Sequence, residues 1–160
     1  MITKELAHKF FEYKDGILYW KAMPYKRNDL IGTEAGTLDD GRRQITINKK
    51  HYKTHRLVYL MFHGYMPKEV DHIDNNPLNN SIENLREATR SEQLCNTRIK
   101  ANNTSGFKGV SWDKSRNKWI VTVTKDKKTV YTSRFKDLEL AQLVAIEARD
   151  KYHNSFARHQ

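Results

Sequence analysis

The hydrophobic positions in the first half of the chain predict short strands between two helices. Leu6, Phe10 and Phe11 recur at helical spacing, and the apolar residues after His55 do so again. Strand composition and turn composition alternate between these two segments. The expected elements are a helix at residues 2–13, a turn at 14–16, strands at 17–20 and 44–48, hairpin turns at 39–41 and 48–50, and a helix that runs from His55 until Gly64 and Pro67 end it.

The second half of the chain predicts three strands followed by a helix. Residues 70–85 are rich in Asn and acidic side chains, which disfavour regular structure, so we expect a structured loop there. The other expected elements are a helix at 91–100, a linker at 101–106, strands at 107–112, 118–124 and 129–135, and a helix at 137–152 with Asp137 as its N-cap and an apolar stripe of Leu140, Leu143, Val144, Ala148 and Tyr152. This order predicts a three-stranded antiparallel sheet packed on one helix.

The net charge of +10 and the pI near 9.7 favour a polyanionic partner. The charge is uneven, because residues 1–54 carry 11 Lys and Arg against 7 Asp and Glu, residues 55–100 carry 6 against 6, and residues 101–160 carry 12 against 6. Basic flanks would suit a nuclease that grips the DNA backbone there and keeps central carboxylates for a cation. Double-stranded DNA is therefore the expected partner.

The composition disfavours membrane-spanning and disulfide-rich classes of protein. The longest apolar run, residues 57–62, is too short to cross a bilayer, and the N-terminus has no apolar signal segment. The single cysteine, Cys95, cannot form an internal disulfide and falls short of a Cys-rich zinc cage, so we expect no structural zinc. We expect a cytoplasmic protein without membrane association or an obligate protein partner, in which Cys95 is a buried, inert thiol.

Asp71 and His72 offer side by side two groups that phosphodiester hydrolysis needs. The reaction requires a water nucleophile, a base that deprotonates it and a cation that neutralises charge on the phosphate. An imidazole with a pKa near neutrality suits the base, and a carboxylate suits the cation. Because adjacent residues of a strand point to opposite faces, we expect a bulged or turning backbone to make the two side chains converge.

The same segment resembles the HNH homing-endonuclease-like family of phages. The likeness rests on Asp71-His72, the Asn-rich loop and Glu83-Asn84-Leu85-Arg86, and it extends from His55-Arg56 to Asn96. It implies a ββα-metal site in which His72 is the general base, Asp71 is a metal ligand and Asn84 orients the histidine. Arg56 is a candidate phosphate contact, and for the neighbouring His55 a structural role is an equally plausible alternative.

The third signature position of the family departs from the common pattern. Gln93 stands where many relatives have His or Asn, and Asn96 lies one helical turn further on. Either amide oxygen is a hard ligand that could complete the metal site, and Asn96 is favoured slightly because Asn is the usual ligand type of the family. Magnesium is the ion implied, with manganese as a possible substitute.

Residues 103–159 resemble the Apetala/ethylene-response-factor DNA-binding domain. The likeness rests on Phe107-Lys108-Gly109-Val110, Lys118-Trp119 and the closing Asn154-Ser155-Phe156-Ala157. It implies a three-stranded sheet that reads the major groove of DNA. Alternation in the middle strand supports this, because Trp119, Val121 and Val123 would face the helix and leave the other face for DNA. The candidate DNA contacts are Lys108, Trp112, Arg116, Thr122, Thr124, Tyr131 and Arg134.

The sequence thus predicts an α+β protein with an HNH nuclease domain at residues 1–100, including a β-rich N-terminal extension, and an Apetala/ethylene-response-factor-like domain at residues 101–160. The expected function is metal-dependent hydrolysis of DNA by a phage-encoded or homing-type endonuclease in the host cytoplasm. The alternative is a DNA-binding regulator with an inactive HNH fold. Whether one or both strands are cut, and the oligomeric state, stay open at this point.

Overall fold

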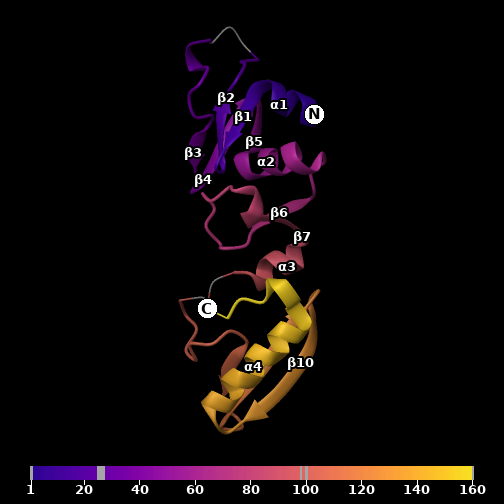
Figure 1. Ribbon diagram of the computed structural model, residues 1–160. Helices are drawn as coiled ribbons and strands as arrows, with labels where there is room; N and C mark the ends of the chain where they lie inside the picture. Colours follow the sequence, from indigo (N-terminus) through magenta and orange to yellow (C-terminus); the bar gives the residue numbers. More distant parts are fainter. Residues whose placement is uncertain (1, 25–27, 98, 100, 160) are drawn as a thin grey trace. The chain divides into compact units, whose positions relative to one another are not determined.

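A computed structural model describes residues 2–24, 28–97, 99 and 101–159, and the chain divides into two compact units (Figure 1). Unit 1 is Met1–Ala88 and unit 2 is Thr89–Gln160. The short helix α3, Arg90–Cys95, therefore groups with unit 2, whereas the sequence analysis assigned it to the nuclease domain.

The described residues of unit 1 form three small antiparallel sheets and two α-helices. The strand orders are β1-β2, β3-β4-β5 and β6-β7. The elements in chain order are α1 Lys4–Phe10, β1 Phe11–Lys14, β2 Ile17–Trp20, the 3-10 helix η1 Asn28–Leu30, β3 Thr37–Asp39, β4 Arg42–Ile47, β5 Lys50–Lys53, α2 Thr54–His63, β6 Glu69–His72, the 3-10 helix η2 Ile82–Asn84, and β7 Leu85–Ala88.

The first helix ends earlier than the sequence predicted. The side chain of Thr3 accepts a hydrogen bond from the backbone N–H of Leu6 and caps α1, but the helix stops at Phe10. Phe11 begins β1, pairs with Trp20 and is only 2% exposed. The prediction of a helix over residues 11–13 was wrong because pairing with β2 buries Phe11 in the core, and tertiary packing overrides local periodicity.

Helix α2 forms the centre of the unit 1 core. Leu57 and Val58 are fully buried, and the helix packs against α1 and β4. It ends at Gly64, whose φ of 83° lies in the left-handed region, as expected from the sequence. At roughly 2 kcal/mol per fully buried aliphatic side chain, this face of α2 is a major source of stability for unit 1.

Residues 70–85 are only partly a loop. Val70 and Leu85 are buried and lie on the paired strands β6 and β7, so the irregular segment is limited to residues 73–81 and η2. The prediction of an uninterrupted loop was wrong at both ends, because an apolar anchor at each end is enough to start a short antiparallel ladder.

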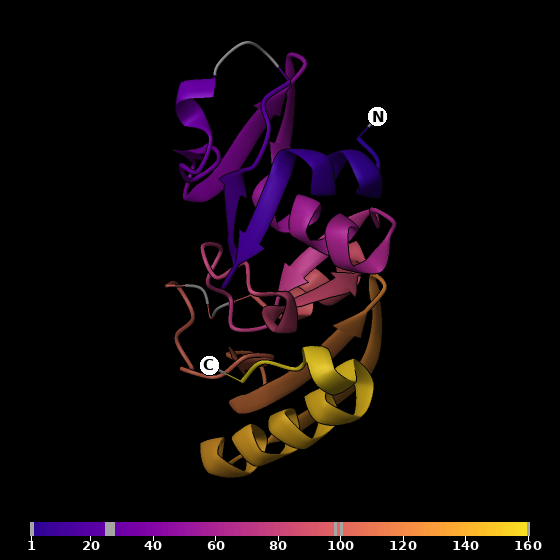
Figure 2. The ribbon, with the colours of Figure 1, turned by 45° about the horizontal axis from the view of Figure 1, so that its top comes forward.

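Unit 2 has the predicted three-stranded antiparallel sheet with one helix against it (Figure 2). The helix α4 packs mainly on the central strand, and the sheet order is β10-β9-β8. Thr89 and Glu92 form a capping box at the start of α3. The remaining elements are β8 Val110–Asp113, β9 Lys118–Lys125, β10 Lys128–Phe135, α4 Leu138–His153 and the 3-10 helix η3 Asn154–Phe156.

The buried face of α4 agrees with the predicted stripe only in part, because Ala148 is buried but the two leucines of the stripe are exposed. Asp137 caps the helix as expected, by accepting from the backbone N–H of Leu140. However, Leu140 is 49% and Leu143 is 64% exposed, whereas Ala141 and Ala145 lie against the sheet. The large side chains at this interface, Val110 and Val121 among them, come from the sheet. Only small side chains of α4 then fit against them at normal packing density.

Candidate functional site

Asp71 and His72 are the last two residues of β6, and the strand is regular there. Asp71 pairs with Arg86 and His72 pairs with Leu85, in a register that runs unbroken along the ladder. The two side chains therefore leave the strand in opposite directions. The expected bulge is absent from this ladder, and the chain turns only after His72, where the backbone N–H of Asn75 donates to the His72 carbonyl oxygen at 3.0 Å.

The Asp71 carboxylate is held by its cross-strand neighbour. Arg86 donates to Oδ2 of Asp71 from Nε at 3.0 Å and from Nη2 at 2.9 Å. Both side chains are largely buried, at 12% exposure for Asp71 and 17% for Arg86. A largely buried pair with this geometry fixes the direction of the carboxylate, because moving either partner would leave a poorly solvated charge.

His72 is buried and is oriented by an amide. Its Nε2 lies 3.0 Å from Oδ1 of Asn80, and the two residues are 5% and 4% exposed. With an amide oxygen as acceptor, Nε2 carries the proton of the neutral ring and Nδ1 carries the lone pair. Burial lowers the pKa of His72, and this outweighs the opposing effect of the Asn80 hydrogen bond. The ring is therefore neutral near pH 7.

The ring of His55 packs against the ring of His72. The two ring centroids are 4.9 Å apart in an edge-to-face arrangement. His55 is only 4% exposed, and burial, followed by the neighbouring His72 and Arg42, lowers its pKa to about 3. His55 is thus a neutral wall behind His72, which supports the structural role that the sequence left as one of two alternatives.

Asn84 organises the loop between β6 and β7. Its Oδ1 accepts from the backbone N–H of Asp74 at 3.0 Å, and its Nδ2 donates to Oδ1 of Asp74 at 2.9 Å and to the Asn79 carbonyl oxygen at 2.8 Å. The sequence predicted Asn84 to orient the histidine, but Nε2 of His72 donates its hydrogen bond to Oδ1 of Asn80. Through these bonds Asn84 supports the loop that carries Asn80.

Sequence reasoning did not single out Asn80. The available signal was its place in the Asn-rich loop that begins two residues after His72, but several amides in this loop have the same composition signal. Only the fold distinguishes Asn80, which is buried, from Asn79, whose amide nitrogen donates to Oδ2 of Asp74 at 2.8 Å.

Arg56 has a structural contact rather than an exposed position. Its Nη2 donates to the carbonyl oxygen of Pro67 at 2.8 Å, and its Nε is buried. This bond ties α2 to the segment before β6. The candidate phosphate contact is thus committed to the backbone of its own unit.

Gln93 and Asn96, the alternative ligands from the third signature position, both belong to α3 of unit 2. Oε1 of Gln93 lies 3.5 Å from Nη1 of Arg90. Asn96 is the C-cap residue of α3 and is 4% exposed. Both residues belong to unit 2, whereas Asp71 and His72 belong to unit 1. The choice between Gln93 and Asn96 as metal ligand therefore stays open.

The face of the sheet away from α4 presents two arginines that share one carboxylate. Oδ2 of Asp113 accepts from Nε of Arg134 at 3.2 Å and from Nη1 of Arg116 at 3.4 Å. Hydrogen bonds from Ser115, and then from Arg134 and Arg116, lower the pKa of Asp113 to about 2. Asp113 is 14% exposed, whereas Arg134 and Arg116 are 39% and 61% exposed. A partly covered carboxylate thus holds two accessible cations in place.

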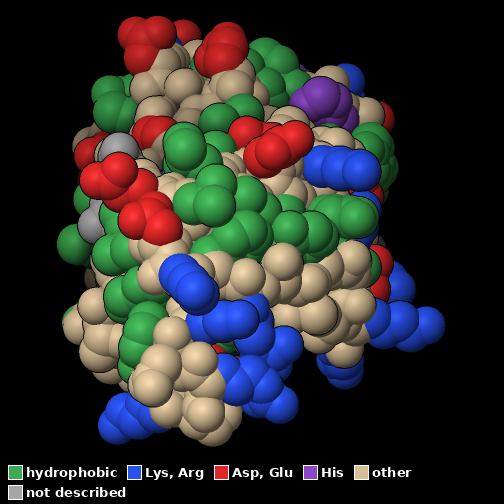
Figure 3. Space-filling model, turned by 90° about the horizontal axis from the view of Figure 1, so that it is seen from below, with side chains coloured by type: hydrophobic (Ala, Val, Ile, Leu, Met, Phe, Trp, Pro, Cys, Tyr) green, Lys and Arg blue, Asp and Glu red, His purple; other side chains and the backbone are tan. Residues whose placement is uncertain are grey.

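The strand register sorts the other candidate DNA contacts between the two faces. Cross-strand partners share a face, so Thr122 and Thr124 lie with Arg134 on the face away from α4. Lys and Arg side chains gather along one side of the molecule when it is viewed from below (Figure 3).

Two aromatic candidates lie on the opposite face of the sheet, where Trp112 is 40% exposed. Trp112 pairs with Trp119, with ring centroids 4.9 Å apart, and Trp119 packs on the unit 2 core. Tyr131 packs on the same core, because a bulge between Thr129 and Tyr131 shifts the alternation of β10. Neither aromatic residue shares a face with Arg134.

Lys108 is turned toward backbone carbonyls. Its Nζ donates to the carbonyl oxygens of Thr97 and Cys95 near the end of α3. Burial, followed by nearby Arg149 and Arg158, lowers the pKa of Lys108 to about 8. Cys95 is half-buried, its Sγ lies 3.2 Å from Nδ1 of His153, and burial raises the pKa of its thiol, which agrees with the expected inert thiol.

Comparison with known proteins defines the class of the protein. Residues 52–94, which run from the end of β5 through β6, β7 and most of α3, match the HNH endonuclease family. The chain therefore carries an HNH nuclease domain, which implies DNA binding and indicates phosphodiester hydrolysis; HNH nucleases generally use divalent metal ions.

The relative found is a phage protein. The chain is 39% identical over 117 residues to "Protein 3.8" of Escherichia phage T7, an alignment that covers 69% of this chain and 94% of that protein. The chain belongs to the same family as this phage protein. No solved structure shows a significant match. Within the described residues, none of the helices has the length and apolarity that a membrane span requires.

Proposed function

We propose that this protein is a metal-dependent DNA endonuclease in which His72 is the general base. The observation that carries the proposal is the state of His72 inside the HNH match: a buried, neutral imidazole whose Nε2 is bonded to Asn80. That tautomer leaves the lone pair on Nδ1, which is the form that a proton-abstracting imidazole needs.

The donor set suits a hard divalent cation. Asp71 supplies a carboxylate, and Gln93 or Asn96 would supply an amide oxygen, which are ligand types for Mg²⁺ or Mn²⁺ rather than for structural zinc. Among the described residues no group of three or more His, Cys, Asp and Glu side chains gathers, and a site of one carboxylate with amides would not form such a group. When bound, the cation would neutralise charge on the scissile phosphate and on the leaving oxygen.

The chain's own residues then divide the remaining work. Nδ1 of His72 takes the proton from the attacking water, and Asn80 holds the ring in the required tautomer. Asn84 and Asp74 keep the loop that carries Asn80 in one conformation. Arg86 fixes the direction of the Asp71 carboxylate.

Unit 2 is proposed to bind duplex DNA through the face away from α4. The sequence resembles the Apetala/ethylene-response-factor domain, and the observed three-stranded sheet with one helix agrees with that architecture. Arg116 and Arg134 are the proposed phosphate contacts, with Thr122 and Thr124 beside them.

A DNA-binding protein with an inactive nuclease domain is the second candidate. The observation in its favour is the Asp71–Arg86 pair, because a guanidinium on the carboxylate opposes a cation there. The substitution of Gln93 for the more common His or Asn points the same way. The two candidates share the binding face and differ in cleavage.

Incubation of the purified protein with supercoiled plasmid separates them. We expect nicked or linear product with Mg²⁺, no product with EDTA, and loss of cleavage by His72→Ala with duplex affinity retained. His51→Ala is the matched control, since His51 is exposed and its Nδ1 is bonded to the hydroxyl of Thr46 in the β4-β5 hairpin. Wild-type protein that binds but never cuts would establish the second candidate, and Mg²⁺-dependent cutting by the His72 variant would remove the assignment of the base.

A further inference from the structure

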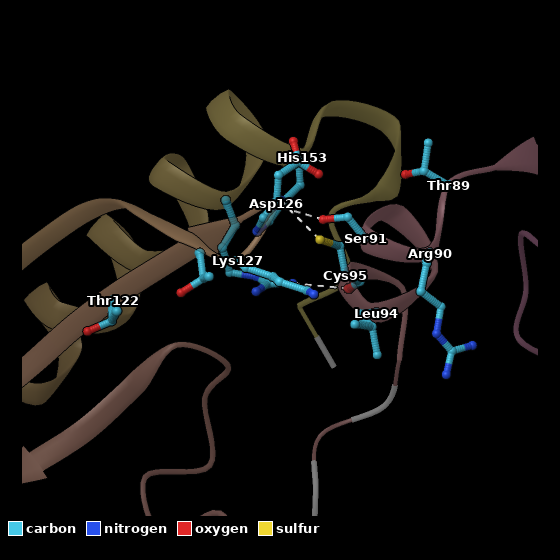
Figure 4. A pocket seen from close by; sticks show the side chains of 11 residues that line it. Thr89, Arg90, Ser91, Leu94, Cys95, Thr122, Asp126, Lys127 and His153 are labelled. Carbon is cyan, nitrogen blue, oxygen red and sulfur yellow. Dashed lines mark hydrogen bonds between the residues drawn. The ribbon is translucent and has the colours of Figure 1, made fainter.

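Unit 2 contains a pocket of about 720 Å³ that the proposed catalytic groups do not use. It is lined by residues from α3, from β9 and the following turn, and from α4. In the close view, Arg90 and Thr122 lie on opposite sides of the pocket, with the side chain of Lys127 between them (Figure 4). Thr122 and Thr124 belong both to this lining and to the face away from α4.

Arg149 is the buried cation of this pocket. It is 8% exposed, and its Nη2 donates to the carbonyl oxygens of Cys95 at 3.3 Å and Arg158 at 3.0 Å. Its Nε is buried and has no hydrogen-bond acceptor among the described residues. Both acceptors are neutral carbonyls, and in the described part of the chain no carboxylate forms an ion pair with Arg149. Burial accordingly lowers the pKa of this guanidinium.

A buried guanidinium without an anion is costly to keep. Removing an ion from water costs several kcal/mol by order of magnitude, and neutral carbonyls recover only part of that cost. Two further cations, Arg90 and Lys127, line the same pocket, against one carboxylate, Asp126. The hydroxyls of Thr and Ser side chains complete the polar lining. Cations with hydroxyl donors are the groups that recognise phosphate.

We propose that this pocket seats a phosphate group of bound DNA, with Arg149 as the buried charge and Arg90 and Lys127 as accessible partners. The source of the phosphate rests on the proposed DNA-binding function, because the pocket shares Thr122 and Thr124 with the proposed binding face. A duplex on that face would bring its backbone to the pocket's edge. The same site would accept inorganic phosphate weakly, since the recognised chemistry is the same.

The test uses the full chain and two probes. The first is inorganic phosphate, followed by ³¹P line broadening and by the thermal unfolding midpoint at constant ionic strength. The second is a short fluorescent duplex, followed by anisotropy across a salt series with EDTA present. The variants are Arg90→Ala/Lys127→Ala, which changes exposed side chains, and Arg149→Met. The charge-matched control is Lys136→Ala/Lys151→Ala, at two exposed positions outside the pocket lining.

We expect the ³¹P line of phosphate to broaden in the presence of the wild type and of the control, and phosphate to raise the thermal unfolding midpoint of both. Neither effect is expected with the pocket variants. For the duplex, the logarithmic salt slope of the pocket double variant should fall by roughly one relative to the control, as for the loss of one phosphate contact. If Arg149→Met does not fold, the double variant alone decides. Equal salt slopes and an equal response to phosphate in the double variant and the control would overturn the assignment of the pocket as a phosphate site.

The two proposals fail in different ways. A wild type that binds phosphate but no duplex would overturn DNA as the source and the DNA-binding function together. A wild type that binds and cuts DNA while the double variant behaves like the control would overturn only the pocket.

Discussion

The buried His55 ring makes the stability of unit 1 dependent on pH. In the folded protein its pKa falls from 6.5 to about 3, chiefly because of burial. The unfolded chain therefore binds more protons than the folded chain between these two values, so stability falls as the pH drops through the unfolded pKa and levels off below the folded one. Replacing His55 with Phe keeps an aromatic ring against His72 and removes the titration.

The size of the effect follows from the pKa values. Between about pH 7 and about pH 5, the cost of keeping the imidazole neutral grows by about 2 kcal/mol, from the linkage relation at 1.36 kcal/mol per pKa unit. Other titrating groups change the stability of wild type and His55→Phe alike. The difference between the two proteins should therefore shift by about 2 kcal/mol in favour of the variant on acidification.

Urea unfolding followed by ¹⁹F NMR of fluorotryptophan measures this difference for unit 1 alone. The chain has 3 tryptophans, and Trp20 is the one in unit 1, so its resonance reports the unfolding of that unit separately. A difference between wild type and variant that stays constant from neutral to acidic pH would refute the claim that His55 is buried as a neutral ring.

Two other substitutions test features of the loop and of the binding face. Gly16→Ala should destabilise unit 1 by roughly 1–3 kcal/mol for its backbone conformation alone, because Gly16 has φ +83° and an added Cβ would lie 2.7 Å from the Ser81 nitrogen; an unchanged urea midpoint at the Trp20 resonance would contradict this. Asp113→Asn removes a negative charge from a basic protein, yet duplex affinity in anisotropy should fall, because Arg134 and Arg116 lose their anchor. Tighter binding by this variant would mean that Asp113 only repels phosphate.

The sequence predicted elements best where the hydrophobic pattern was long or where glycine, proline or polar turn residues marked its ends. Helix α2 with its Gly64 end, and the three strands before α4, were confirmed. The errors fell where two patterns competed for the same residues. Phe10 and Phe11 fit a helix, but Phe11 enters a strand because only the fold shows the partner at Trp20. On α4, Leu140 and Leu143 made a plausible stripe, but the sheet supplies the bulk and selects the alanines.

The candidate site was predictable as a segment but not as a set of contacts. Asp71 and His72 were found because their spacing to Asn84 carries a family signature. The roles of Asn80 and His55 depend on burial and on ring packing, which composition does not encode. Strand alternation placed Thr122 and Thr124 on one face, but the bulge that turns Tyr131 toward α4 has no clear mark in the sequence.

The abundance of Asn in the loop after β6 has a physical explanation in the hydrogen bonds. Residues 73–81 make few ladder bonds, so side chains take the place of a neighbouring strand. Asp74, Asn76 and Asn79 each accept from a backbone N–H two residues further on, at 2.8, 3.1 and 3.3 Å, and repeated Asx turns of this kind fix the path of the chain.

Asn84 closes the same loop from the side of β7, through its three bonds to Asp74 and Asn79. Burial raises the pKa of Asp74, but the hydrogen bonds it accepts from Asn76, Asn79 and Asn84 outweigh this and keep it low, so the network is intact near neutral pH. A loop fixed in this way can hold Asn80 within hydrogen-bond distance of His72 without the support of regular structure. Amides suit this purpose because each one both donates and accepts hydrogen bonds. An amide also carries no negative charge, which would favour the protonated form of the neighbouring imidazole.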